Sequence, residues 1–230
     1  MEAYLVVQIF ALLFWSFQLA PQAWENYKRR STEGLSSLMM LFWTFGSLAT
    51  AIYVIGEKTG GRYSLLFILQ PNLFMVFSVT CWAQTVCYQS GSMQIGISAG
   101  VGLTAALLLS EVLGAHYLLQ SNDENAPYIA LGSLSLIFFA LGFIPQYVQI
   151  YSARKVEGIS IPFLMIDMTG SILSITSLAM QKHFEPISGA CYIIVFVLDF
   201  IIVVLHYLLP FVYKPLALMS EREEDSSWRI

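Results

Sequence analysis

Hydrophobic residues occur along this chain in long runs that are separated by short polar segments. A helix that crosses a bilayer needs roughly 20 mainly apolar residues, and the runs have about that length. The candidate spans are residues 4–24, 35–56, 64–88, 93–117, 127–151, 160–181 and 187–212. These runs are too long and too evenly apolar for barrel strands, and lipid offers the backbone no hydrogen-bond partner. The pattern therefore predicts an all-α integral membrane protein with seven transmembrane helices.

Composition agrees with this prediction. Of the 230 residues, 57% are hydrophobic and 11% are charged, and the mean hydropathy is +0.68. Soluble domains carry about 25% charged residues. The first run follows Met1 and Glu2 directly, without a basic segment or a small-residue cleavage pattern, which predicts a retained helix rather than a signal peptide.

The lysines and arginines between the predicted spans indicate an orientation. If the N-terminus lies outside the cytosol, the cytosolic segments hold Lys28, Arg29, Arg30, Arg154, Lys155, Lys214, Arg222 and Arg229. The opposite side then holds only Lys58, Arg62 and Lys182. Because cytosolic loops are enriched in basic residues, this distribution predicts a lumenal or external N-terminus and a cytosolic C-terminus.

The chain contains an internal repeat. Segment 20–47 matches segment 144–171 at a constant offset of 124 residues, with identical Pro-Gln and Glu-Gly pairs. The matched positions include Pro21/Pro145, Gln22/Gln146, Tyr27/Tyr151, Arg30/Arg154, Glu33/Glu157, Gly34/Gly158, Ser36/Ser160, Gly46/Gly170 and Ser47/Ser171. The match extends to segments 77–88 and 196–207 at an offset of 119, which places Thr80 opposite Asp199.

This repeat predicts a 3+1+3 arrangement. Residues 1–92 and 121–213 would form two three-helix repeats that run parallel across the membrane, joined by a linker helix within residues 93–120. Residues 214–230 would form a cytosolic tail. The tail contains Tyr213-Lys-Pro-Leu216, a pattern that resembles a tyrosine-based sorting signal and would bind sorting adaptors.

Two prolines lie late within apolar runs, at equivalent points of the repeat. Pro21 and Pro145 each remove one helix hydrogen bond and free the carbonyl of Phe17 or Leu141, which predicts a kink. A symmetric pair of kinks suits hinges for alternating access, although a fixed bend that aids packing is the alternative. Gln22 and Gln146 follow these prolines and can hydrogen-bond the opened backbone or a neighbouring helix.

The Pro-Gln pairs, the basic loops and the Glu-Gly-Leu/Ile-Ser segments resemble the PQ-loop family. That family includes cystinosin, the lysosomal and vacuolar cationic amino acid exporters and, more distantly, the SWEET sugar transporters and the KDEL receptors. The second half is most similar to cystinosin. The resemblance implies seven helices and proton-coupled amino acid export from an acidic organelle. It also places Asp167 and Asp199 at the two helix aspartates of cystinosin and Gln146 in the second motif.

Acidic residues deep in predicted spans are candidates for chemistry because ionisable groups there are costly and usually serve a path or a site. Asp167 is predicted to accept a proton or to bind a substrate ammonium group, the alternative being a structural aspartate satisfied by hydroxyls. Asp199 and His206 lie seven residues apart, on one helix face, and are predicted to pass a proton. His206 could instead reach the membrane interface. Glu111 and His116 are expected at that interface.

Other polar and aromatic residues are predicted to line a substrate cavity, ordinary packing being the alternative for each. The predicted substrate-binding set is Asp167, Gln146, Gln22, Trp43, Gln84 and Thr80, with Tyr27 and Tyr151 as further candidates. Gly46 and Gly170 are expected to allow close helix contact. Cys81, Cys87 and Cys191 fall inside predicted spans without metal-site or disulfide spacing and are expected to be packing residues.

The sequence therefore predicts a proton-coupled transporter that exports a cystine-like or cationic amino acid across a vacuolar or lysosomal membrane. No enzyme motif is present, and no cofactor, metal or nucleic acid is expected. The expected partners are the small-molecule substrate, protons and the lipid bilayer. A ligand-binding receptor or nutrient sensor of the same fold is an alternative. A passive sugar carrier is disfavoured by the two buried acids.

Overall fold

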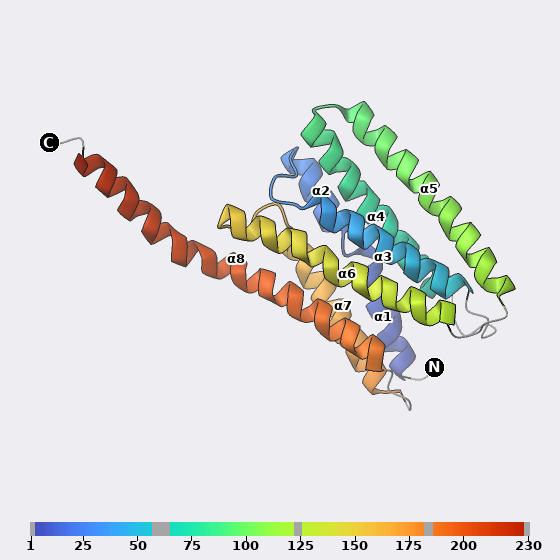
Figure 1. Ribbon diagram of the computed structural model, residues 1–230. Helices are drawn as coiled ribbons and strands as arrows, with labels where there is room; N and C mark the ends of the chain where they lie inside the picture. The colour runs from blue at the N-terminus through green and yellow to red at the C-terminus, as the bar shows by residue number, and fades with distance from the viewer. Residues whose placement is uncertain (1–2, 57–64, 122–125, 182–185, 228–230) are drawn as a thin grey trace.

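The computed structural model describes residues 3–56, 65–121, 126–181 and 186–227, and these residues are helical apart from short connections. The helices are α1 (Ala3–Phe17), α2 (Ala20–Arg29), α3 (Ser37–Gly56), α4 (Leu65–Ser90), α5 (Met93–Gln120), α6 (Ala126–Ala153), α7 (Ile161–Ala179) and α8 (Pro186–Ser227) (Figure 1). Because α1 and α2 together form one apolar segment, the described chain consists of seven helical segments, which agrees with the predicted all-α class.

Within the described residues, six of these segments are long and apolar enough to cross a membrane. They are Ala3–Arg29, Ser37–Ile55, Met93–Gln120, Ala126–Ala153, Ile161–Ala179 and Gly189–Val212. The remaining predicted span, residues 64–88, corresponds to α4, which has 26 residues but is not in this set. Its apolar sequence is interrupted by Gln70, Asn72 and Gln84, among others. It nevertheless packs between α3 and α5 in the bundle (Figure 1).

The two in-span prolines have different effects on their helices. The first span breaks at Gln18 and Leu19, and Pro21 lies within the first two positions of the helix that restarts as α2. A proline is tolerated at that point because the first N–H groups of a helix have no partner within it. In contrast, α6 continues through Pro145 to Ala153. The helix break before Pro21 agrees with the kink predicted there, whereas α6 is continuous through Pro145 and the kink predicted at that residue stays a prediction.

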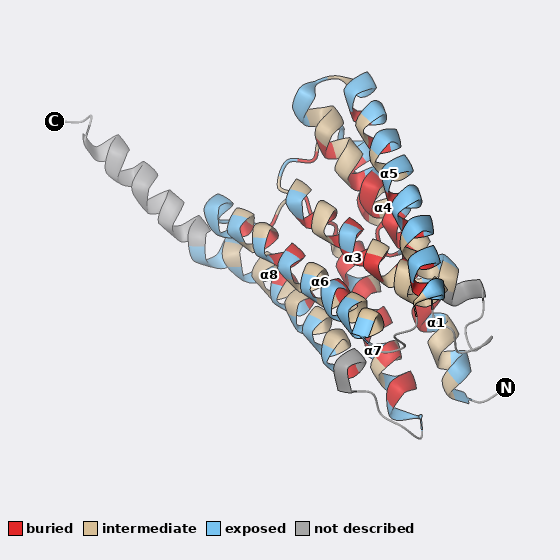
Figure 2. Ribbon diagram, turned by 45° about the vertical axis from the view of Figure 1, so that its right-hand side comes forward, coloured by how far each residue is buried: buried red, intermediate tan, exposed pale blue. Residues whose placement is uncertain are grey.

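The helices predicted to form the two repeats meet along two helix pairs. Helices α1 to α4 contact α6 to α8 mainly where α1 packs on α7 and α3 packs on α6. Helix α5, the predicted linker, lies on the outside, against α3 and α4, and most of its surface is exposed (Figure 2). Gly96 lets α5 approach α4 closely, because a Cβ there would lie 2.5 Å from Cβ of Cys87.

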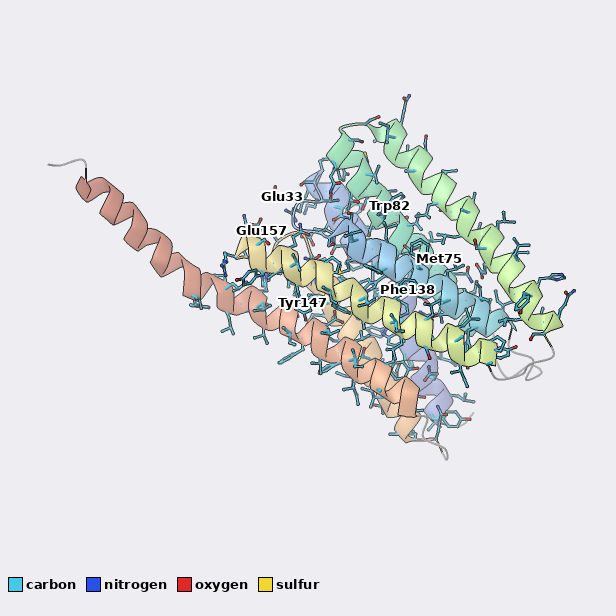
Figure 3. All side chains as sticks on the ribbon, viewed as in Figure 1. Glu33, Met75, Trp82, Phe138, Tyr147 and Glu157 are labelled. Carbon is cyan, nitrogen blue, oxygen red and sulfur yellow. The ribbon has the colours of Figure 1, made fainter. Side chains whose placement is uncertain are left out.

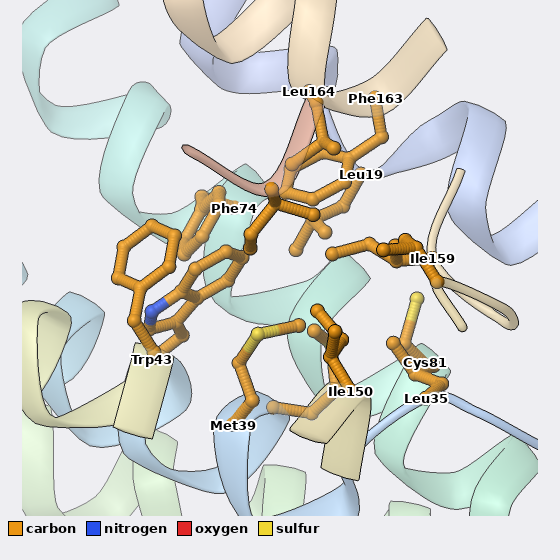
Figure 4. Close-up of a cluster of buried hydrophobic side chains, with 14 residues drawn as sticks. Leu19, Leu35, Met39, Trp43, Phe74, Cys81, Ile150, Ile159, Phe163 and Leu164 are labelled. Carbon is orange, nitrogen blue, oxygen red and sulfur yellow. The ribbon is translucent and has the colours of Figure 1, made fainter. Parts of the chain in front are cut away.

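A buried apolar cluster joins the repeats and is hereafter called the apolar core (Figure 4). Trp43 of α3 is at its centre, with ring centroids 5.2 Å from Phe143, 5.7 Å from Phe163 and 6.0 Å from Phe74. The other buried members are Leu19, Leu35, Met39, Met40, Cys81, Ile150, Val156, Ile159, Leu164 and Ile202. Burial of Cys81 here agrees with its predicted packing role.

The predicted C-terminal tail is helical over most of its length. Helix α8 continues past the end of its apolar segment at Val212 to Ser227, and it projects beyond the rest of the bundle (Figure 1). The side chains of residues 213–227, including the predicted sorting motif at 213–216, lie outside the described residues.

Candidate functional site

Each glutamine of the two Pro-Gln motifs binds the main chain of the other repeat. Gln22 accepts a hydrogen bond from the Ser160 N–H (2.6 Å) and donates one to the Gly158 carbonyl (2.7 Å). Gln146 accepts one from the Ser36 N–H (2.9 Å) and donates one to the Gly34 carbonyl (2.9 Å). Both glutamine side chains are fully buried. They form a reciprocal pair, hereafter the glutamine clamps.

The clamps hold the α2–α3 connection (residues 30–36) and the α6–α7 connection (residues 154–160), and these two connections cross each other at two glycines. Gly34 has φ +86° and Gly158 has φ +77°, a conformation that residues with a side chain rarely adopt. A Cβ on Gly34 would lie under 3.0 Å from the carbonyl of Glu157, and one on Gly158 would lie equally close to the carbonyl of Glu33. Figure 3 shows Glu33 and Glu157 at the same end of the bundle. We call this contact the loop crossing.

The residues before the loop crossing are also matched between the repeats. Arg30 and Arg154 both have left-handed backbones, with φ 53° and 57°. The Arg30 guanidinium lies 4.4 Å from the Tyr27 ring centroid, and that of Arg154 lies 4.5 Å from the Tyr151 centroid. The offset of 124 residues is therefore confirmed in three dimensions. Tyr27 and Tyr151 are exposed surface residues, which contradicts their predicted place in a cavity.

Among the described residues, further polar side chains support the first clamp but not the second. Gln22 also donates to Asn26 (2.9 Å), Asn26 donates to Gln84 (2.9 Å), and Gln84 donates to the Ala23 carbonyl (3.0 Å). The residue equivalent to Asn26 in the second repeat is Ile150, which is part of the apolar core. Gln22, Gln146 and Gln84 thus hold the helices together, and their predicted contact with substrate stays a prediction.

The two predicted aspartates come together between α7 and α8. Asp167 is 3% exposed and Asp199 is 0% exposed, and their carboxyl groups lie close enough to interact electrostatically. Two carboxylates side by side in apolar surroundings repel each other unless a proton or a cation lies between them. The geometry therefore favours one negative charge, or a bound cation, at this pair.

Aromatic residues enclose the aspartate pair. Trp15 of α1 donates its indole N–H to the Asp167 carbonyl (3.3 Å), and its ring fills the space beside Gly170. The predicted close contact at Gly170 is confirmed. Tyr147 of α6 lies near Asp199 and donates its hydroxyl proton to the Leu198 carbonyl (2.6 Å).

No basic side chain neutralises the pair within the described part of the chain. The salt bridges there, Arg29–Glu25 and Lys155–Glu157, lie at the surface. Neither carboxylate oxygen of Asp199 receives a hydrogen bond from a described N–H or O–H group. Buried polar atoms are normally paired, so these oxygens mark a place that a proton or a ligand would complete.

The residues opposite these aspartates in the first repeat differ from the prediction. Trp43 is opposite Asp167 as predicted, but it is buried in the apolar core and its indole N–H is bound to the Phe139 carbonyl (3.1 Å). Thr80, aligned with Asp199 and predicted to bind substrate, is exposed and bonded to its own helix at Val76. The burial pattern of α4 matches that of α8 at an offset of 121 instead, which aligns Asp199 with the buried Ser78.

His206 and Glu111 occupy different places from the aspartate pair. His206 is half-buried on α8, and its described ring contact is with Tyr207; its predicted proton transfer stays a prediction. Glu111 is 5% exposed between α5 and α4, where it accepts a hydrogen bond from Asn72 (3.0 Å). Its predicted location at the membrane interface stays a prediction, since burial against α4 does not fix its depth in the membrane.

Sequence reasoning missed two buried polar residues. Gln18, in the break between α1 and α2, and Ser171, one turn after Asp167, each have a buried oxygen without a described partner. Neither residue is charged nor part of the Pro-Gln motif, so no feature of the sequence distinguished them from the many polar residues of other spans. Their position beside a helix break and a buried acid would have been the available signal.

Comparison with known proteins gives a consistent result. A family model described as PQ loop repeat matches residues 3–60 and 128–187, that is, both repeats. An uncharacterized protein of Schizosaccharomyces pombe is 30% identical over 211 residues, covering 88% of this chain and 71% of that protein. A membrane protein of Saccharomyces cerevisiae is 30% identical over 177 residues, covering 74% of this chain and 55% of that protein.

Two further similarities concern proteins with named functions. Cystinosin of Drosophila melanogaster is 26% identical over 185 residues, covering 74% of this chain and 46% of that protein. The chain thus spans less than two thirds of the length of cystinosin and of the budding yeast relative. A eukaryotic SWEET transporter has the same fold, with a TM-score of 0.60 and 17% identity over 90% of this chain and 99% of that chain.

Proposed function

Because the chain belongs to the PQ-loop repeat family, we propose that it is a proton-coupled transporter that exports an amino acid, cystine-like or cationic, from an acidic organelle. The observation that carries the proposal is the buried pair Asp167–Asp199, which has no basic partner among the described residues. Similarity to cystinosin supports the substrate class, and the shared SWEET fold supports a transporter.

The aspartate pair couples the proton to the solute by simple electrostatics. When the site faces an acidic lumen, one carboxyl group takes up a proton, and the remaining carboxylate attracts a substrate ammonium group. The site is then close to neutral, so it can change its exposure without carrying an uncompensated charge across the apolar region. The higher pH of the cytosol favours release of the proton on that side, which gives net export its direction.

The loop crossing and the apolar core form the closed cytosolic side in this proposal. The clamps of Gln22 and Gln146 connect the repeats directly, and Trp43 lies at the centre of the apolar core. Movement of one repeat against the other would break these inter-repeat bonds and open a path. Pro21 and Pro145 would act as the hinges, and the helix break at Pro21 makes the first the more flexible of the two.

The membrane arrangement follows the same proposal. The chain crosses the membrane seven times, with α4 as the least apolar crossing, in two parallel three-helix repeats joined by α5. The N-terminus lies in the lumen, the C-terminal part of α8 lies in the cytosol, and a vacuolar or lysosomal membrane is the location. Sorting adaptors would bind the cytosolic extension at residues 213–216.

The test is solute flux into proteoliposomes of the purified protein. Radiolabelled lysine, arginine, cystine and leucine are offered with and without an imposed proton gradient, beside Asp167→Asn. Accumulation above equilibrium that requires the gradient and is lost in Asp167→Asn would support the proposal. Flux that ignores the gradient and survives Asp167→Asn would leave a facilitator. Binding without flux by the wild type would instead favour a receptor or sensor.

A further inference from the structure

The Gln18 side chain has no counterpart in the second repeat. Helices α1 and α6 are equivalent at an offset of 124, and the structure supports this equivalence on both sides of Gln18. Gln22 and Gln146 form equivalent clamps, and Trp15 packs on Gly170 as Phe139 packs on Gly46. The position equivalent to Gln18 is therefore residue 142, which is a glycine.

Position 142 has no room for a side chain because it faces Trp43. A Cβ at Gly142 would lie 2.5 Å from Cδ1 and from Nε1 of Trp43, so the indole occupies the space that a side chain would need. The equivalent contact between α1 and α7 has the reverse combination. Asp167 replaces the indole with a much smaller side chain, and Gln18 replaces the glycine. The repeat symmetry therefore places the Gln18 side chain against the turn of α7 that carries Asp167.

Direct contacts agree with this placement. Trp15 lies one helical turn before Gln18 and donates to the Asp167 carbonyl, so the two residues share the face of α1 that packs on α7. Leu19, the next residue, belongs to the apolar core together with Phe163 and Leu164 of the same region of α7. Gln18 is thus enclosed by α7 on the side of the aspartate pair.

The Gln18 amide is incompletely paired. The residue is 6% exposed, and its Oε1 atom is buried without a hydrogen-bond donor among the described residues. Both carboxylate oxygens of Asp199 have the same deficit. A site with several unpaired acceptors, and with no described lysine or arginine at the acids, favours a ligand that brings N–H donors and positive charge. An ammonium group meets both requirements.

We propose that Gln18 is a specificity-determining residue whose amide carbonyl accepts a hydrogen bond from the ammonium group of the solute, beside the carboxyl group of Asp167. The amide fixes the direction of the ammonium group, whereas the acid supplies the charge. A solute without a free ammonium group leaves the carbonyl unpaired and is rejected. This inference deepens the proposed transport function, but it concerns binding and can be tested without transport.

The experiment measures binding and flux separately. Binding of L-lysine, L-arginine, L-cystine and L-leucine, and of forms of lysine, cystine and leucine in which every amino group is acetylated, is measured on detergent-purified full-length protein by isothermal titration. The variants are Gln18→Leu, which keeps the size but removes the carbonyl, and Gln18→Asn, which keeps the amide on a shorter side chain. Gln8→Leu is the matched control, because Gln8 lies ten residues earlier, on α1, and is half-buried.

The expected result is binding of at least one free amino acid and none of its acetylated form by the wild type. Gln18→Leu should weaken that binding about tenfold, as expected for one hydrogen bond to a charged group, while Gln8→Leu changes it less than about twofold. Gln18→Asn should restore part of the loss. In flux assays, Gln18→Leu should raise KM with little change in the requirement for a proton gradient.

Several outcomes would overturn the inference. Unchanged affinity in Gln18→Leu, or equal binding of the acetylated form by the wild type, would show that the carbonyl does not receive the ammonium group. Binding of none of the four amino acids by the wild type would contradict the ligand class. Wild-type binding without flux would reject the proposed transport and leave the role of Gln18 to be decided by the affinities alone.

Discussion

The two repeats are closely alike where their connections cross and unlike further into the bundle. At the loop crossing, each glutamine clamp, each left-handed arginine and each glycine has an equivalent partner at an offset of 124 residues. At the aspartate pair, in contrast, the first repeat has Trp43, Ser78 and Gln18, whereas the second has Asp167, Asp199 and Gly142. The two repeats therefore share the same structure at the loop crossing and differ at the level of the bundle that holds the aspartate pair, hereafter the asymmetric layer.

This difference separates structural from functional constraints. A Gly–Gly contact at a symmetry axis admits no side chain in either copy, so both copies must stay the same. The layer with Asp167 has no such restriction, because Trp43 fills one side of the interface while the acids occupy the other. The asymmetric layer is consequently the better candidate for solute and proton binding, and the following predictions test that division.

The largest expected effect is on Asp199 compared with its equivalent Ser78. Asp199→Asn should reduce gradient-driven flux to the level of protein-free liposomes, because the asparagine cannot exchange a proton. Ser78→Ala removes a buried hydroxyl without a described partner and should retain most of the flux. The measurement is the initial rate of amino acid uptake under an inward proton gradient. Equal losses in both variants would mean that the layer functions symmetrically.

The second prediction concerns the glycines of the loop crossing. Gly34→Ala and Gly158→Ala should each destabilise the protein by about 3 kcal/mol or more, because positive φ and a backbone collision combine. Gly91→Ala is the matched control: it has φ +66° but open space around it, so about 1 kcal/mol is expected. Thermal unfolding in detergent should rank the variants in this order. Similar unfolding midpoints for all three variants would show that the two connections can move apart at the loop crossing without loss of stability.

The third prediction compares the two clamps. Gln22→Leu leaves Ser160, Gly158 and Asn26 with unpaired groups, whereas Gln146→Leu leaves only Ser36 and Gly34. Since an unpaired buried polar group is unfavourable by about 1–3 kcal/mol, Gln22→Leu should be the more destabilising by about 1 kcal/mol. The same unfolding assay measures both. If Gln146→Leu were worse, the polar network through Asn26 would not strengthen the first clamp.

The smallest effect is expected at the matched arginines. Arg30→Ala and Arg154→Ala each keep a non-glycine residue in the left-handed conformation and remove the guanidinium that is stacked on Tyr27 or Tyr151. An exposed contact of this kind contributes about 0.5–1 kcal/mol, so both variants should lose about that much stability. A difference above about 1 kcal/mol between the stability losses of the two variants would show that the two arginines contribute unequally despite their similar geometry.

The fold could be predicted from the sequence to a large extent, because apolar runs and the Pro-Gln repeat are local features. The offset of 124 residues was confirmed by the clamps and by the loop crossing. The offset of 119 for the last helices was wrong by two residues, since apolar helices without polar landmarks align almost equally well in several registers. Burial of Ser78 and exposure of Thr80 decide the register, and burial depends on neighbouring helices.

The site could be predicted only in part. Asp167 and Asp199 stood out because acids are rare in apolar spans, although nothing in the sequence indicated that they contact each other. Gln22 and Gln146 were predicted to bind substrate. Their partners in the structure could not be identified from the local sequence, because Gly158 lies 136 residues from Gln22 and Ser36 lies 110 residues from Gln146. Gln18 was missed because its significance depends on comparison with Gly142 and Trp43 in space.

The most direct test of the central claim is proton movement driven by the solute alone. Proteoliposomes that contain the purified protein and a trapped pH-sensitive dye receive the transported amino acid at equal internal and external pH. The account predicts internal acidification with wild-type protein, because each solute enters with a proton, and no change with Asp167→Asn. Solute entry without acidification in the wild type would contradict the claim that the aspartate pair couples protons to transport.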